Sequence, residues 1–188
     1  MNYDRGTKKE NAYYDDVDLY EYHHRHYNWD IPYYSALAAQ ACGAILELGA
    51  GSGRLTLPML EAGATVSAVD LSASLIARLD ARLQERRAEP LRARATTCVA
   101  DFRELRLTRR YARVLFPFNT LLHAYSDEDL ASAFATARRH LAQGGELHFD
   151  IGVPDLAYLA QSGQVRHERR ALRLPGLSEK VSRRTLNL

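Results

Sequence analysis

The sequence predicts an α/β protein in which a mostly parallel, doubly wound sheet carries helices on both faces. Short apolar runs alternate along the chain with amphipathic stretches of helical period, an order typical of parallel strands joined by crossover helices. The first run, Ile45–Leu48, leads into three glycines at alternate positions, and the second, Thr65–Val69, delivers Asp70 at its end. Strand, glycine turn, helix, strand and acid together predict a unit that binds a nucleoside.

The composition indicates one ordinary globular domain. With 188 residues, 46% of them hydrophobic and 26% charged, the chain can bury one core and is short for two. It has no apolar window of membrane-span length, and its polar N-terminus has no signal-peptide core. Cys42 and Cys98 form neither a disulfide framework nor a metal-ligand pattern, so we expect a reducing cytoplasm. The net charge of +2 does not favour nucleic acid as a partner.

The aromatic composition of residues 1–42 predicts that this segment forms an N-terminal arm. Eight aromatic residues lie between Tyr13 and Tyr34, and such rings combine apolar area with polar tips. They suit a lid over a ligand and equally an arm that packs on the domain. Near the end of the arm, Asp30 is placed to cap a helix with Pro32 in its first turn.

Two charged segments could bind a metal ion or a phosphate, but for each we favour a solvent-exposed segment without a binding role. The run His23–His26 contains an arginine that would repel a metal ion, and carboxylate or thiolate partners are missing from it. Arg78, Arg82 and Arg86 share one side of a predicted helix with interspersed acids. Those acids dilute the field, which favours a solvated helix face over a phosphate-binding surface.

The core, residues 43–155, continues after Asp70 with a helix that Ser72 can cap. The apolar face of this helix holds Leu75, Ile76, Leu79 and Leu83. A third strand is predicted at Thr96–Val99 and a fourth at Val114–Asn119. Proline at position 117 is unusual inside a central strand, so we expect the ladder to end there.

A last helix and strand complete the predicted core. Ser126, with Asp129 three residues later, resembles a capping box and opens the helix. Gly144–Gly145 is expected to stop this helix. Glu146–Ile151 then forms the fifth strand.

The C-terminal extension, residues 156–188, predicts an antiparallel hairpin. Two polar, arginine-rich segments, Val165–Leu174 and Lys180–Leu188, flank the turn signal Pro175–Gly176. Their polarity leaves at most one face to bury, so we expect the hairpin over the sheet edge or across the site. A short helix at Asp155–Gln161 would precede it.

The glycine turn separates the classes of cofactor. A dinucleotide fingerprint needs Gly-x-Gly-x-x-Gly, but Arg54 stands where the third glycine belongs. No Gly-Lys-Ser/Thr follows, which excludes a P-loop. The spacing Glu47-x-Gly49-x-Gly51-x-Gly53 instead resembles that of the Rossmann-like (class I) S-adenosylmethionine-dependent methyltransferases.

This resemblance spans about Tyr13 to Asp155 and implies a set of cofactor-binding residues. The loop under S-adenosyl-L-methionine would comprise Glu47, Gly49, Ala50, Gly51 and Gly53. Asp70 would accept hydrogen bonds from both ribose hydroxyls, Leu71 would pack near the adenine, and Asp101 would receive the adenine amino group. The remaining contacts would be Phe102, Phe118 and the covering tyrosines Tyr13, Tyr14 and Tyr20.

The segment after the fourth strand implies the class of acceptor. Phe116–His123 resembles the "APFN…H" segment of bacterial small-molecule methyltransferases of this superfamily. It implies in-line transfer of a methyl group to an O or N of a small molecule, which Asn119 and His123 orient or deprotonate. Asp150, at the end of the fifth strand, is a weaker candidate, since such an acid often only caps the next turn.

Two departures from the family pattern leave alternatives open. Ala112–Arg113 stands where the family has an acid before the fourth strand, and the family's sixth and seventh strands have no counterpart. We therefore expect either a fragment or a chain completed by another subunit, a homodimer included. The alternatives to a methyltransferase are an NAD(P)-dependent oxidoreductase, against which Arg54 argues, and a cofactor-binding, non-catalytic subunit that needs a partner chain.

Overall fold

The structure divides into two compact units, Met1–Ile151 and Gly152–Leu188. It is a computed structural model that describes residues 13–85, 89–153, 167–172 and 181–186. The first unit contains the sheet and the predicted site. The second contains two antiparallel strands.

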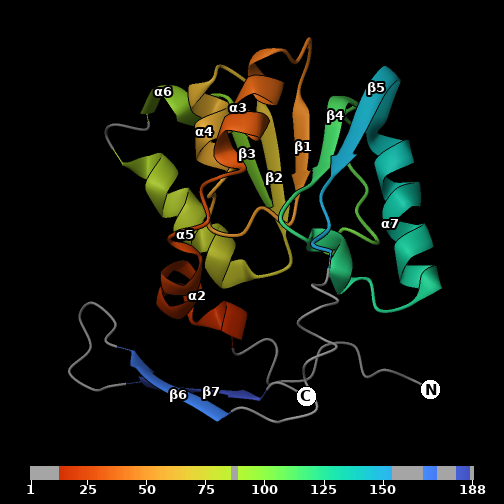
Figure 1. Ribbon diagram of the computed structural model, residues 1–188. Coiled ribbons are helices and arrows are strands. Elements are labelled where there is room, and N and C mark those ends of the chain that lie inside the picture. The colour runs from red at the N-terminus through yellow and green to blue at the C-terminus, as the bar shows by residue number, and fades with distance from the viewer. Residues whose placement is uncertain (1–12, 86–88, 154–166, 173–180, 187–188) are drawn as a thin grey trace. The chain divides into compact units, whose positions relative to one another are not determined.

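The sheet of the first unit has the strand order β3-β2-β1-β4-β5, and all its pairings are parallel (Figure 1). The strands are β1 (Ile45–Leu48), β2 (Val66–Asp70), β3 (Ala95–Val99), β4 (Tyr111–Phe116) and β5 (Leu141–Phe149). The first strand, β1, lies in the middle of the sheet. β2 and β3 extend the sheet on one side, and β4 and β5 extend it on the other. The predicted doubly wound parallel sheet is therefore confirmed.

Helices cover both faces of this sheet. The helical elements are α2 (Val17–His24), α3 (Ile31–Ala39), α4 (Thr56–Glu61), α5 (Ala73–Gln84), α6 (Glu89–Arg92), the 3-10 turn η2 (Thr120–His123) and α7 (Asp127–His140). Successive residues of a strand point to opposite faces: Ile45 joins the core under α3, α4 and α5, and Leu46 joins the core under α7 (Figure 1). All four residues of β1 are buried as a result.

Two predicted helix starts are confirmed. The Ser72 hydroxyl accepts a hydrogen bond from the Leu75 amide at 3.2 Å, and the Ser126 hydroxyl accepts one from the Asp129 amide at 3.1 Å. Amides in the first turn of a helix have no backbone acceptor, and each hydroxyl accepts a hydrogen bond from one of them. The apolar face predicted for α5 is buried, at Leu75, Ile76, Leu79 and Leu83.

The prediction that Gly144–Gly145 stops α7 is wrong. The helix ends at His140, and β5 begins at the next residue, Leu141. The glycines lie in a bulge of β5, where its pairing with β4 shifts register between Leu141 and Glu146 and Gly144 adopts φ 73°. Glycine inside a strand marks such a bulge as readily as glycine ends a helix, and the local sequence does not separate the two roles.

Pro117 ends the ladder of β4, as predicted, because proline has no amide to donate. The strand itself begins at Tyr111, earlier than the predicted Val114. Tyr111 is buried and donates a hydrogen bond to the Ser67 hydroxyl of β2 at 3.1 Å. This contact between two strands holds the early residues of β4 in the sheet.

The second unit contains two antiparallel strands, β6 (His167–Leu172) and β7 (Val181–Leu186), paired from His167↔Leu186 to Leu172↔Val181. The predicted pair of antiparallel strands is therefore confirmed. The helix predicted at Asp155–Gln161 and the turn predicted at Pro175–Gly176 lie outside the described residues.

Candidate functional site

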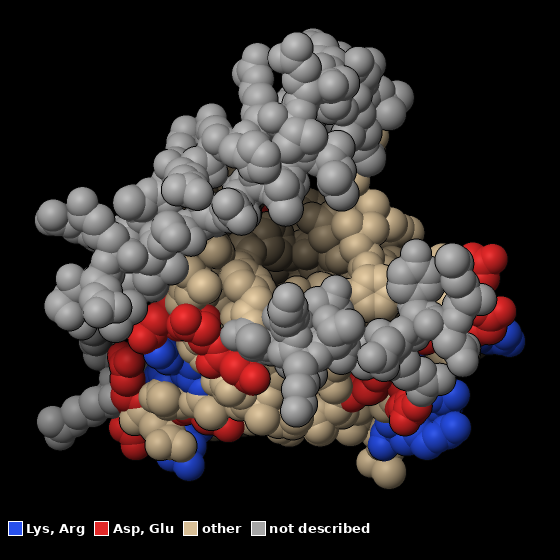
Figure 2. All heavy atoms as spheres, turned by 90° about the horizontal axis from the view of Figure 1, so that it is seen from below, with Lys and Arg blue, Asp and Glu red and all other residues tan. Residues whose placement is uncertain are grey.

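The carboxyl ends of the five strands lie along one edge of the sheet, the lower edge in Figure 1. In open α/β sheets, ligands bind outside this edge where the strand order reverses. Here the reversal lies between β1 and β4, and the glycine turn follows β1. Figure 2 views this edge from below and shows a hollow in which the described side chains are mainly ones other than Lys, Arg, Asp and Glu.

The glycine turn packs tightly against two other segments. Gly49 adopts φ 80°, and a Cβ there would lie 2.3 Å from Oγ1 of Thr120, at the start of η2. Gly53 adopts φ 90°, and a Cβ there would lie 2.4 Å from Cδ1 of Leu79 on α5. Both positions need glycine, because a side chain would meet neighbouring atoms and a left-handed backbone at once.

Asp70 holds the glycine turn from the end of β2. Its carboxylate accepts hydrogen bonds from the Gly51 amide at 2.7 Å and from the Ser72 amide at 2.9 Å. Burial raises the pKa of Asp70 above its usual value, and these two hydrogen bonds oppose that rise. The next residue, Leu71, is 64% exposed. An anchored carboxylate beside an open apolar side chain therefore lies at the edge of the sheet.

Glu47 lies beneath the turn rather than on its surface. It is 1% exposed, and its carboxyl accepts a hydrogen bond from the Thr56 hydroxyl of α4 at 2.6 Å. Burial raises the pKa of Glu47 from its usual 4.5 to about 8. In the structure Glu47 thus ties β1 to α4 as a protonated acid near neutral pH, and Ala50 above it is also buried.

The two residues predicted after β3 are engaged with protein groups. Both oxygens of Asp101 accept hydrogen bonds from the Arg103 guanidinium, at 2.6 to 3.0 Å. Arg103 also forms an ion pair with Asp129 of α7 at 3.0 Å. Phe102 packs edge-on against Phe116 with the ring centres 5.5 Å apart. Arg103 is a contact that the sequence pattern did not reveal.

Phe118 and Asn119 form a left-handed turn after β4, with φ 53° and 62°. This backbone costs an L-residue about 1–2 kcal/mol, and asparagine tolerates it better than phenylalanine does. The Asp150 carboxylate accepts hydrogen bonds from both amides, at 2.7 Å from Phe118 and 3.1 Å from Asn119. Asn119 is the N-cap of η2, which ends at His123. The two predicted catalytic residues therefore lie at the two ends of one short turn.

The aromatic arm reaches both the glycine turn and His123. Tyr13, Tyr14 and Tyr20 pack on one another, with ring centres 5.2 to 6.0 Å apart. The Tyr20 hydroxyl lies 3.0 Å from the place that a Cβ on Gly51 would take. The Tyr14 hydroxyl lies 3.3 Å from Nε2 of His123. The structure thus gathers residues that are far apart in the sequence.

Arg78 and Arg82, predicted to lie on a solvated helix face, have side chains that are 36% and 33% exposed and that also pair with the arm. Arg86, predicted on the same face, lies outside the described residues. Arg78 forms ion pairs with Asp18 at 2.7 Å and Glu21 at 3.0 Å, both on α2. Arg82 forms an ion pair with Glu21 at 3.0 Å and donates to the Ser52 carbonyl of the glycine turn at 2.9 Å. These arginines attach the arm to α5, a role that helix periodicity alone cannot show because the partner helix is distant in sequence.

Asp30 has a different partner from the one predicted. It occupies the N-cap position of α3, but its side chain makes no cap hydrogen bond. The carboxylate instead pairs with both terminal nitrogens of Arg54, at 2.6 and 2.7 Å. The Arg54 guanidinium also lies 4.5 Å from the ring centre of Phe118. Arg54, which directly follows Gly53, thus joins the glycine turn to the arm and to the turn after β4.

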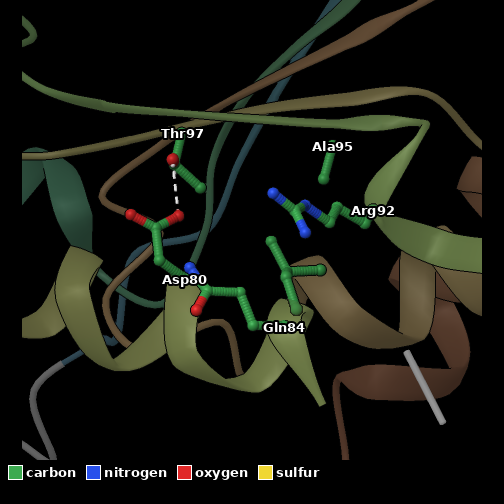
Figure 3. Close-up of a pocket in the computed structure, with 6 residues that line it drawn as sticks. Asp80, Gln84, Arg92, Ala95 and Thr97 are labelled. Carbon is green, nitrogen blue, oxygen red and sulfur yellow. Dashed lines mark hydrogen bonds between the residues drawn. The ribbon is translucent and has the colours of Figure 1, made fainter. Parts of the chain in front are cut away.

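A second, polar pocket of about 320 Å³ lies between α5, α6 and β3, where the Thr97 hydroxyl donates to Asp80 at 2.7 Å (Figure 3). It includes Ala95, the first residue of β3, so it lies toward the amino ends of the strands and away from the glycine turn.

In the part of the chain that the structure describes, no helix has the length and apolarity to span a bilayer. The same residues contain no cluster of three or more potential metal ligands.

Comparison with known proteins agrees with this geometry. A family model described as a methyltransferase domain matches residues 45–145. A Streptomyces protein, cypemycin N-terminal methyltransferase, is 30% identical over 110 residues, which cover 58% of this chain and 42% of that protein.

Solved structures give the same result for the fold. The glycopeptide N-methyltransferase MtfA, crystallised with sinefungin, is 26% identical and aligns with a TM-score of 0.62 over 85% of this chain and 65% of its own. DesVI of Streptomyces venezuelae, 19% identical, aligns with a TM-score of 0.63 over the same shares. The chain thus spans under two thirds of the length of these relatives. Its match to the family model over more than half its length shows that this chain belongs to the methyltransferase-domain family.

Proposed function

We propose that this chain is an S-adenosyl-L-methionine-dependent methyltransferase that moves a methyl group to an O or N of a small-molecule acceptor. The observation that carries the proposal is Asp70, 2.7 Å from the Gly51 amide at the end of β2. A carboxylate there has lone pairs for the two hydroxyls of a ribose, and the exposed Leu71 offers an apolar surface for a base. Family membership and the likeness to MtfA, which has also been crystallised with S-adenosyl-L-methionine, support the same cofactor.

The other cofactor contacts proposed here fit to different degrees. Gly49, Gly51 and Gly53 leave the turn without side chains at the edge of the sheet, with Tyr20 beside it. Both oxygens of Asp101 already accept from the Arg103 backbone and side chain, so an adenine amino group would have to share or displace one of these donors. Glu47 and Ala50 support the turn from within the core.

The proposed chemistry needs alignment more than it needs a protein nucleophile. The bound cofactor supplies an electrophilic methyl group. Asn119 and His123 orient the acceptor, and the His123 imidazole takes up the proton where one must leave the methylated group. The Tyr14 hydroxyl, 3.3 Å from Nε2 of His123, orients the imidazole ring. Such alignment can lower a barrier by about 7–11 kcal/mol.

Two further parts of the proposal concern the cellular compartment and the oligomeric state of the protein. Cys42 and Cys98 are both free thiols, which supports a reducing, cytoplasmic compartment. We also propose a homodimer or a completing partner chain. Light scattering of the purified chain measures which state it adopts.

The proposal is tested by comparing ligands and two matched aspartate variants. Isothermal titration of the wild type with S-adenosylhomocysteine and with NADH separates the methyltransferase from the oxidoreductase alternative. Asp70→Asn should weaken S-adenosylhomocysteine binding about tenfold or more, because it removes a charged acceptor. Asp80→Asn, at the Thr97 hydrogen bond of the second pocket, should leave that affinity unchanged.

The contrary outcomes are equally specific. Tight binding of NADH without binding of S-adenosylhomocysteine would support the oxidoreductase. Binding of S-adenosylhomocysteine without methylation of any amine or hydroxyl in an acceptor panel, followed by activity once a partner chain is added, would support the non-catalytic subunit.

A further inference from the structure

The Asp150 carboxylate has more protein donors than a turn cap requires. It accepts hydrogen bonds from the Phe118 amide at 2.7 Å, the Asn119 amide at 3.1 Å and the Tyr34 hydroxyl at 2.6 Å. These donors come from the segment after β4 and from α3, while Asp150 directly follows β5. One side chain therefore joins three elements at the carboxyl edge of the sheet.

The Phe118–Asn119 turn depends on such an anchor. Two successive residues other than glycine have positive φ, 53° and 62°, and a strained backbone of this kind persists only where its surroundings hold it. Both amides of the turn point to one acceptor. Without Asp150, both amides would lose a charged acceptor, and the left-handed backbone would have less to hold it.

The anchor is itself fixed from the opposite side. Tyr34 is 3% exposed and belongs to the core under α3, α4 and α5, so its hydroxyl donates to Asp150 from a rigid position. Burial and the Asp150 carboxylate both raise the pKa of Tyr34, which keeps the hydroxyl a donor. The ring of Phe118 is held independently by Arg54, at 4.5 Å. Backbone and side chain of the turn thus have separate supports.

We propose that Asp150 is a positioning residue, which fixes the Phe118–Asn119 turn and through it the direction of the Phe118 and Asn119 side chains toward the site. This inference rests on the proposed function for its catalytic meaning, because that function assigns acceptor contact to Asn119 and the family resemblance implies cofactor contact at Phe118. Asp150 makes no contact with the reacting atoms in this proposal. Its effect passes through the turn.

Hydrogen exchange and ligand binding test the proposal with Asp150→Ala and Asp150→Asn. In Asp150→Ala, amide exchange in the segment 117–121 should rise about tenfold, since hydrogen bonds to a charged acceptor are lost, while exchange in β1 and β2 stays at the wild-type rate. Affinity for S-adenosylhomocysteine should fall about tenfold for the same reason. Asp150→Asn keeps one acceptor oxygen and should show an intermediate change in both. Glu146→Gln, on β5, the strand just before Asp150, and 58% exposed, is the control.

Several outcomes overturn the inference. Exchange and affinity in Asp150→Ala within about twofold of the wild type, the spread expected of a surface substitution, would remove any positioning role. Faster exchange throughout the core in both Asp150 variants would make the residue structural only. Failure of the wild type to bind S-adenosylhomocysteine would contradict the proposed function, while the exchange measurement would still decide whether Asp150 anchors the turn.

Discussion

Arg54 and Asp30 form a two-pronged ion pair, with nitrogen–oxygen distances of 2.6 and 2.7 Å. Asp30 is 5% exposed and the Arg54 side chain 21% exposed. Arg54 also donates to the Tyr27 carbonyl at 2.8 Å. The residue that departs from the dinucleotide fingerprint is therefore the one that ties the aromatic arm to the glycine turn.

Removing Arg54 should destabilise the fold more than removing the charge of Asp30. Arg54→Ala leaves a buried carboxylate without its cation, so we expect a loss of about 2–3 kcal/mol in the free energy of unfolding, discounted for the partly exposed arginine. Asp30→Asn leaves a guanidinium that water can reach and should cost about 1 kcal/mol. Urea unfolding of both single variants and the double variant gives the coupling energy. Purely additive effects would contradict the pairing.

Glu47 should make the stability of the protein fall as pH rises. The folded state holds the proton up to about pH 8, while the unfolded chain releases it near pH 4.5. The contribution is therefore fully present below pH 4.5 and is lost between pH 4.5 and 8, at a slope of at most about 1.4 kcal/mol per pH unit. In Glu47→Gln this slope should disappear from urea unfolding measured across that range. Glu61→Gln, an exposed carboxylate on α4, should keep the wild-type slope. Parallel curves for wild type and Glu47→Gln would refute the buried acid.

Arg82 should control how firmly the arm stays on the glycine turn. It pairs with Glu21 at 3.0 Å and donates to the Ser52 carbonyl at 2.9 Å. The pair is partly exposed, so Arg82→Ala should cost about 1 kcal/mol or less and raise amide exchange in α2 about three- to fivefold. High salt should raise α2 exchange in the wild type and add little in the variant. Arg138→Ala, exposed on α7, should leave α2 unchanged. An unaltered exchange rate in Arg82→Ala would remove this attachment.

His123 and Tyr14 should matter for transfer more than for cofactor binding. His123→Ala should lower turnover, followed as S-adenosylhomocysteine released with an accepted substrate, by about 10²-fold if it moves a proton. Tyr14→Phe removes one hydrogen bond to the imidazole and should cost about tenfold. Tyr33→Phe removes another tyrosine–histidine contact, to His148 at 3.1 Å, and serves as the matched control. Unchanged turnover in His123→Ala would dismiss this histidine as the base.

The elements that could be predicted from the sequence are those whose signals are local. The helix that starts at Ser72 and the end of β4 at Pro117 follow from a side-chain cap and a missing amide. The order of strands and helices then gives the parallel sheet. The prediction that Gly144–Gly145 ends α7 failed because glycine is common both in β-bulges and at helix ends. Only the pairing of β5 with β4 decides between these two roles.

By itself, the sequence determined the glycine turn, the acid at the end of β2 and the alternation of strands with amphipathic helices. These features depend on backbone stereochemistry and hydrophobic periodicity, which residues near in sequence carry. Only the tertiary structure decided where the charged and aromatic side chains go: Asp101 to Arg103, Asp30 to Arg54, Tyr14 to His123 and Asp150 to the Phe118–Asn119 turn. Such partners depend on which distant segments the sheet brings to one edge, and no local pattern specifies that.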